Sequence, residues 1–261
     1  MKTRIPFLSV VSLLFLLSAC ATTPPFHHLE EAARSQVSDV DVFLIVPQKE
    51  IYAQIDQSNV AAATGGGLLM ALIDAAVDSS RTKTAEQIIQ PIRDKLLNFD
   101  YADELGKEIN TTLKNVGWLH ARDIQLVRTT TDEKQTADLY AKSKASAVLF
   151  VSGNYSLTPN FHSVVTQVSL TMYPKSAALN TYKESDDKNS NPMDGTDNIY
   201  RNHFEYSTVL TTDPNMKKED AAAAVAAASP GKLVDGLTDN ARKIARMIGD
   251  DLMIGSNTAA K

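Results

Sequence analysis

The sequence predicts an α/β fold, in which a mixed parallel and antiparallel sheet is packed with helices in a single domain that has a helical insertion and a C-terminal amphipathic helix. Three observations support this prediction. Residues 123–153 alternate strand-like and helix-like segments, the order of a βαβ unit with parallel strands. Residues 163–173 and 199–210 alternate apolar and polar side chains, as antiparallel strands do. Residues 233–252 repeat apolar side chains every three or four positions, which is typical of an amphipathic helix.

The predicted domain spans residues 40–254 and begins with a strand at 40–46, a run of mainly apolar residues that Pro47 ends. The helical insertion follows this strand. An apolar stripe at 88–96 predicts a helix, and we expect Pro91 to kink or break it because proline removes a backbone hydrogen bond. A further helix is expected to start near Asp100 and to stop at Gly117, with an apolar face made by Leu105, Ile109 and Leu113.

The βαβ unit consists of strands at 123–128 and 147–153 around a helix at 132–144. We expect its two strands to pair in parallel, because a strand, a crossover helix and a second strand are usually neighbours in one sheet.

The next two strands predict their own register. In both of them the apolar face falls on the even-numbered residues, so antiparallel pairing must join residues whose numbers have an even sum. This predicts that Leu170 and Phe204 are buried on one face of the sheet and that Gln167 and Glu205 lie on the other.

A polar connection at 174–198 separates these strands, and a connection of this length is usually functional or disordered. Its Asp and Asn residues suggest calcium, but the EF-hand spacing that starts at Asp187 places Pro192 where glycine is required. We therefore expect a solvated loop. Helices at 216–228 and 233–252 should follow it, and the tail 255–261 is expected to be disordered.

The N-terminus has the layout of a secretory signal peptide, here residues 1–19, with two cations, an apolar run and then small residues. Its end, L17-S18-A19-C20, contains the single cysteine of the 261-residue chain and resembles the lipobox of bacterial lipoproteins. This resemblance implies cleavage before Cys20, a diacylglycerol thioether on its sulfur and acylation of the new amine by a fatty acid such as palmitate. The alternative is an ordinary signal peptide with a chance cysteine.

The resemblance also implies a location. Ala21 follows the cysteine instead of the aspartate that retains many lipoproteins in the inner membrane, which favours the outer membrane with the domain facing the periplasm. Residues 20–39 are expected to be a flexible tether because they begin with Thr and Pro and show no sustained period. We prefer this tether to a metal site at His27 and His28, since no further ligand is spaced to join them.

Charge and cysteine content exclude several partners. Cleavage removes Lys2 and Arg4 from the 26 Lys and Arg residues, which leaves 24 against 31 Asp and Glu, a net charge of −7. An acidic chain is a poor electrostatic partner for nucleic acid or anionic lipid. Acylation of Cys20 would leave no thiol for a disulfide, a metal ion or catalysis.

The sequence predicts neither an enzyme nor a cofactor site. The five histidines form no H-E-x-x-H pair, no G-x-S-x-G elbow occurs, and the glycines at 65–67 are not followed by the lysine of a phosphate-binding loop. Ser152 is expected at the end of a strand and His203 on the outward face of one. We therefore name no catalytic residue, no metal ligand and no cofactor.

The predicted order of elements resembles the α/β domain of envelope lipoproteins such as the curli secretion lipoprotein and the lipoprotein activator of penicillin-binding proteins, and also the N-terminal domain of the Tol-system translocation protein. This resemblance is one of topology, so it transfers no functional residue. The curli channel builds transmembrane hairpins, whereas 174–198 lacks the alternating apolar stretches of about 9 to 11 residues that each strand would need. We expect no pore.

Two hypotheses of function follow. The first is a non-catalytic accessory or scaffold lipoprotein that docks on an envelope protein partner or forms a homo-oligomer. The apolar helix expected at 67–78 would make the contact through Leu68, Leu69 and Leu72, with the preceding glycines as a hinge. The alternative for this helix is ordinary burial in the core. The second hypothesis is a periplasmic domain that binds a small ligand or a peptidoglycan fragment in a closed pocket.

Overall fold

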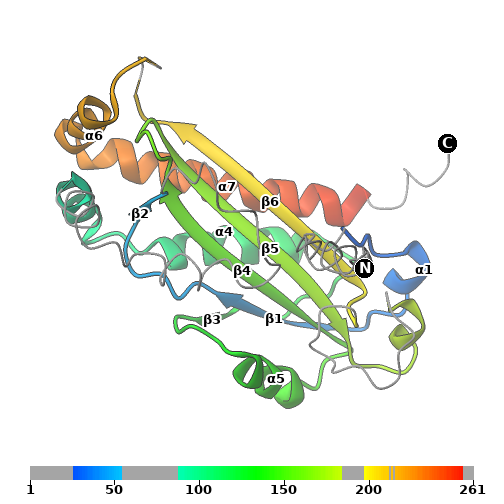
Figure 1. Cartoon of the computed structure of the whole chain (residues 1–261). Coiled ribbons are helices and arrows are strands. Elements are labelled where there is room, and N and C mark those ends of the chain that lie inside the picture. Colours follow the sequence, from blue (N-terminus) through cyan, green and yellow to red (C-terminus); the bar gives the residue numbers. More distant parts are fainter. Residues whose placement is uncertain (1–25, 55–87, 184–196, 212, 214, 255–261) are drawn as a thin grey trace, which may run out of the picture. The chain divides into compact units, whose positions relative to one another are not determined.

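The computed structural model describes residues 26–54, 88–183, 197–211, 213 and 215–254 (Figure 1). These residues belong to one compact unit, which comprises residues 26–56 and 83–261. The predicted lipid attachment point Cys20, the contact residues Leu68, Leu69 and Leu72, most of the acidic loop and the tail 255–261 lie outside the described residues.

A mixed six-stranded sheet forms the centre of this unit, which confirms the predicted fold class (Figure 1). The strands pair in the order β3-β1-β4-β5-β6, and the short strand β2 pairs with the end of β4. The pairs of β1 with β3 and of β1 with β4 are parallel, and those of β4 with β5 and of β5 with β6 are antiparallel. The bounds are β1 (Val40–Ile45), β2 (Tyr52–Ala53), β3 (Gln125–Val127), β4 (Ala147–Leu157), β5 (Ser163–Pro174) and β6 (Tyr200–Val209).

The predicted βαβ unit has two parallel strands, as expected, but these two strands do not pair with each other. Strands β3 and β4 flank the helix α5 (Glu133–Lys142) and run parallel, but β1 lies between them and pairs with both. All six residues of β1 are buried, so this strand gains most from a central place in the sheet. The three residues of β3 are half-buried or exposed, which suits an edge.

The predicted register of the two antiparallel strands is confirmed. Gln167 pairs with Glu205 and the next residue with Phe204, so paired numbers have an even sum. Leu170 is fully buried and Phe204 is 8% exposed, whereas Gln167 is half-exposed and Glu205 is exposed.

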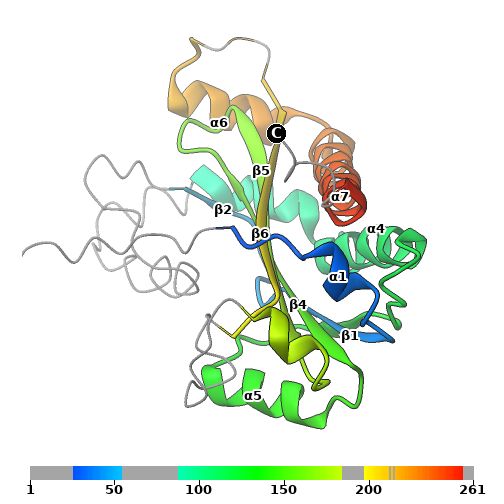
Figure 2. The ribbon, with the colours of Figure 1, turned by 90° about the vertical axis from the view of Figure 1, so that its right-hand side faces the viewer.

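Helices cover both faces of the sheet (Figure 2). The helices α4 (Tyr101–Asn115) and α7 (Pro230–Ile254) pack side by side over the main core. Helix α5 lies on the opposite face, where it packs on a smaller cluster of Phe43, Ile45, Val148, Phe150 and Tyr173. The predicted apolar face of α7 is buried at each position: Leu233, Leu237, Ala241, Ile244, Ile248 and Leu252.

The remaining helical segments are short. They are α1 (Glu31–Arg34), α6 (Lys218–Ala227) and the 3-10 turns η2 (Asp94–Leu96) and η3 (Leu179–Tyr182). The helix around Pro91 is α-helical from 88 to 93 and then tightens into η2, so it ends close to the proline. Helix α4 begins as predicted, because the side chain of Asp100 accepts a hydrogen bond from the Asp103 amide.

The segment predicted to be a flexible tether differs from the structure where it is described. From Phe26 to Asp39 the chain is packed against the domain, with Leu29, Ala33 and Val37 buried in the main core. These three residues are four apart, a short apolar stripe that the sequence analysis did not weigh. A flexible tether is therefore excluded for residues 26–39.

A polar network in the main core ties both large helices to the sheet. Asn240 is fully buried in α7, and its amide group donates to the Val164 carbonyl oxygen at 3.1 Å and accepts from the Thr208 hydroxyl at 2.7 Å. Tyr101 of α4 shares a 2.6 Å hydrogen bond with Thr166, and burial raises the pKa of this tyrosine. Each of these buried polar groups has a hydrogen-bond partner, so burying them costs little free energy. The hydrogen bonds also fix the position of both helices on the sheet.

Two glycines allow close packing of α4. A Cβ on Gly153 of β4 would stand 2.8 Å from a methyl group of Leu105, and a Cβ on Gly249 of α7 would stand 2.6 Å from the methyl group of Thr112. A side chain at either position would force its neighbour to shift, so these close contacts favour glycine. No helix within the described residues has the length and apolarity needed to cross a membrane.

Candidate functional site

Because the predicted lipidation and partner-binding residues lie outside the described residues, the structure neither brings them together nor separates them. The described residues hold two polar clusters that could serve a function. One is on the outward face of the antiparallel strands, and the other is where β1 and β4 begin.

The first cluster, called here the polar face, consists of outward side chains from the three antiparallel strands. Strand pairing places Ser169 between Ser152 and His203, and the adjacent row places Gln167 between Asn154 and Glu205. Ser152, Ser169, His203 and Glu205 are exposed, and the other two are half-exposed. Helix α5 packs over a different part of this side of the sheet, on the cluster around Phe150 and Tyr173.

Hydrogen bonds across the strands hold the polar face in order. The Gln167 amide donates to the Glu205 carboxylate at 2.6 Å, and the Ser169 hydroxyl and His203 Nδ1 are 2.9 Å apart. The side-chain oxygen of Asn154 is shielded from solvent and has no hydrogen-bond partner. The face therefore offers an exposed acceptor at Glu205, beside groups that can donate or accept, on a rigid sheet.

The pair of Ser169 and His203 invites comparison with a catalytic serine. A serine nucleophile requires hydrogen-bond donors that stabilise the oxyanion, and these are often backbone amides. The backbone of β5 is engaged in ladders with β4 on one side and β6 on the other. The pair therefore lacks such donors in its own strand and is better described as a cross-strand surface contact.

Two sequence-based assignments can be compared with this geometry. His203 points outward as predicted, whereas Ser152 is not at a strand end, because β4 continues five residues beyond it to Leu157. Strand β4 is longer than predicted since it gains partners along its whole length from β5. The alternation of β5 and β6 was the signal that could have revealed the polar face.

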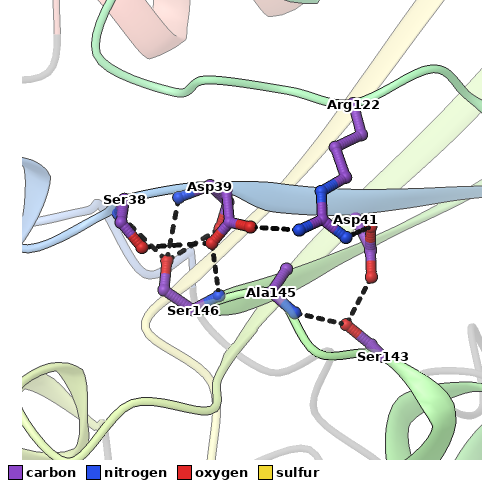
Figure 3. Close-up of polar contacts among 7 residues, drawn as sticks. All are labelled: Ser38, Asp39, Asp41, Arg122, Ser143, Ala145 and Ser146. Atoms are coloured by element: carbon purple, nitrogen blue, oxygen red, sulfur yellow. Dashed lines mark hydrogen bonds and ion pairs between the residues drawn. The ribbon is translucent and has the colours of Figure 1, made fainter.

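The second cluster joins the amino ends of β1 and β4 (Figure 3). The Ser146 amide donates to the Asp39 carboxylate at 2.8 Å, and the Ser146 hydroxyl donates to the Asp39 carbonyl oxygen at 2.7 Å. Arg122 binds the Asp39 carboxylate and reaches Asp41, whose Oδ1 is 3.0 Å from Nη1. The other Asp41 oxygen accepts from the Ser143 hydroxyl at 2.6 Å.

Electrostatics favour a structural role for this second cluster. Burial by itself would raise the pKa of Asp39, but hydrogen bonds from Ser146, Ser38 and Arg122 outweigh burial and hold the pKa below its ordinary value. Asp41 is 6% exposed and its charge is met by Arg122 and Ser143. Carboxylates that are already ion-paired and hydrogen-bonded are poor general bases. Here they stabilise the junction between the starts of β1 and β4.

The described residues contain no group of three His, Cys, Asp or Glu side chains placed to hold a metal ion. His27 is instead hydrogen-bonded through Nδ1 to the Asn198 side chain at 3.2 Å, and its backbone pairs with Arg201. The acidic part of the predicted loop, residues 184–196, lies outside the described residues, so the calcium alternative is not tested.

Comparisons with known proteins give little further information. No protein-family model and no curated protein matches the chain. A solved structure described as a "putative lipoprotein" of Caulobacter crescentus CB15 aligns with 57% of this chain and 81% of its own length, at 15% sequence identity and a TM-score of 0.26. A likeness of this size carries no conclusion about fold or function, and lipidation remains a prediction from residues 17–20.

Proposed function

We propose that this protein is a lipoprotein of the bacterial outer membrane, anchored through Cys20 and facing the periplasm, whose domain is a non-catalytic accessory or scaffold of an envelope complex. The anchor is supported by the L17-S18-A19-C20 sequence that follows a signal-type apolar run. A single acyl chain holds a protein only marginally, whereas the several chains implied by the lipobox give durable attachment.

The observation that supports docking is the polar face. Its side chains are hydrogen-bonded to one another in register on a sheet whose other side is packed against α4 and α7. Groups held in place in this way lose little conformational entropy when they bind a partner, which favours recognition. The proposed partner is an envelope protein or a second copy of this chain, with a surface that donates hydrogen bonds to Glu205.

Photo-crosslinking in intact cells tests this proposal. A photoreactive residue at Ser169 or His203 should give a crosslinked product of defined mass, because these side chains are exposed on the polar face. The matched control is Lys107, which is exposed on α4 on the other side of the sheet. A product twice the mass of the chain would identify a homo-oligomer. The same products from Lys107, or none from any position, would contradict docking through this face.

The described residues do not favour the second hypothesis, a small-ligand or peptidoglycan-fragment site. One hollow in the described part of the chain is lined by Asp132, Glu133, Lys134 and Ala137 at the start of α5. None of these side chains is buried, so the hollow lacks the convergent, enclosed polar groups of a ligand pocket.

A further inference from the structure

One end of the domain gathers the first described residues and the last helix. His27 pairs with Arg201 at the start of β6, with N–H to carbonyl distances of 3.0 and 2.8 Å. At the end of α7, Trp118 donates to the Leu252 carbonyl oxygen at 3.1 Å, and Arg34 of α1 donates to that of Met253 at 3.4 Å. We call this the anchor end; it comprises residues 26–34, the start of β6 and the last turn of α7 (Figure 1).

Strand β6 and helix α7 both extend away from the anchor end. The hydroxyl of Tyr200, the first residue of β6, donates to Asp251 at 2.7 Å, and further along Thr208 donates to Asn240 at 2.7 Å. At 1.5 Å per residue, α7 is about 37 Å long. The start of α7 therefore lies about 30 Å from the anchor end.

The chain between the predicted lipid and the anchor end is short. His27 lies seven residues after Cys20, and a fully extended chain spans at most about 3.6 Å per residue, so the two are separated by about 25 Å at most. This limit follows from covalent geometry alone. An anchor at Cys20 thus holds one particular end of the domain close to the bilayer.

Exposed apolar side chains at the anchor end match a lipid surface. Phe26 is 63% exposed and Met253 is 53% exposed. In water the exposed apolar area of these side chains contributes no stabilisation. Contact with the interfacial region of a bilayer would bury this area, which is worth about 25 cal/mol per Å². The acidic net charge gives no electrostatic attraction, so the covalent anchor and these two side chains must supply the contact.

We infer that the acylated protein stands on the membrane with its anchor end against the lipid headgroups, so that Phe26 and Met253 touch the bilayer while the start of α7 points into the periplasm. This orientation rests on the proposed anchoring at Cys20. It leaves the polar face, on the other side of the sheet from α7, upright and open to partners.

Site-specific fluorescence tests the orientation on the full acylated chain. Cys20 is the single cysteine of the sequence and would be acylated, so Met253→Cys and Lys232→Cys each introduce one free thiol for a dye. Lys232 is exposed in the first turn of α7 and is the matched control. In phosphatidylethanolamine and phosphatidylglycerol vesicles with a nitroxide on the headgroup, emission from position 253 should fall by at least half and emission from 232 should stay unchanged.

The possible outcomes separate the two proposals. Equal quenching at 253 and 232 in protein that floats with the vesicles overturns the orientation and leaves the anchor intact. Failure of the chain to float overturns the anchor, and the orientation with it. If Met253→Cys does not fold, Phe26→Cys replaces it, because Phe26 is exposed at the same end.

Discussion

Replacing Gly249 with alanine should destabilise the domain, although alanine is the better helix former. A Cβ at this position would stand 2.6 Å from the methyl carbon of Thr112, whereas carbon atoms in contact normally stand 3.5–4.0 Å apart. Relieving a shortfall of about 1 Å requires Thr112 to rotate or α4 and α7 to separate, and overpacking of this kind typically costs about 1–3 kcal/mol. Helix propensity returns up to about 1 kcal/mol. The expected net loss is therefore up to about 2 kcal/mol.

Urea unfolding of the chain from Ala21 onward measures this loss, with Gly231→Ala as control. A Cβ on Gly231 in the same helix meets nothing closer than 4.0 Å, so this variant should be unchanged or about 1 kcal/mol more stable. Adding Thr112→Ser to Gly249→Ala deletes the clashing methyl group and should restore most of the loss. Equal stability of the two alanine variants, or no rescue by serine, would refute the proposed close contact.

The other predictions concern the anchor, the sheet, the strand junction and the predicted contact helix. Cys20→Ser should abolish labelling by a radioactive fatty acid, and retained label would disprove lipidation. Leu170→Ala should cost about 2–5 kcal/mol on thermal unfolding because the side chain is fully buried, while Glu205→Ala should cost little; similar losses would contradict the register. Asp39→Asn should weaken the dependence of the free energy of unfolding on pH below about pH 4. The reason is that a carboxyl with a lowered pKa stabilises the fold above its unfolded pKa and loses this effect as pH falls through its folded pKa. An unchanged pH dependence of unfolding would refute this role of Asp39. Leu69→Asp should weaken envelope association or assembly without removing cooperative unfolding, and loss of the cooperative transition would mean that this helix belongs to the core.

Local patterns predicted the sheet well where each strand has one buried face. Alternation in β5 and β6 was enough to predict that paired numbers have an even sum, since a shift by one residue would turn Leu170 toward solvent. Pairing between distant segments was harder to predict. The sequence of β3 does not indicate that this strand pairs with β1. The pairing depends on which strand gains most from burial on both faces, and β1 is buried at all six residues.

Side-chain clusters formed by distant residues were beyond sequence analysis. The junction of Asp39 with Ser146 and Arg122 unites residues that are 107 and 83 positions away from Asp39 along the chain, and no local pattern links them. The polar face is different, because four of its six residues belong to strands whose alternation was recognised. The sequence therefore predicted its outward orientation at Gln167, Glu205 and His203 but not the bonds within it.

The packing of the first described segment against the last helix restricts the order in which the chain can fold. Arg34 bonds to Met253, 219 residues later, and His27 pairs with Arg201. Contacts between residues so far apart form late, because closing a long loop costs entropy before any contact repays it. As the chain is synthesised from its N-terminus, Arg34 cannot reach the Met253 carbonyl oxygen until α7 has been made. The residues nearest the predicted lipid attachment point are thus among the first to be synthesised and the last to find these partners, so a chain truncated before α7 would leave this segment open to proteases and chaperones.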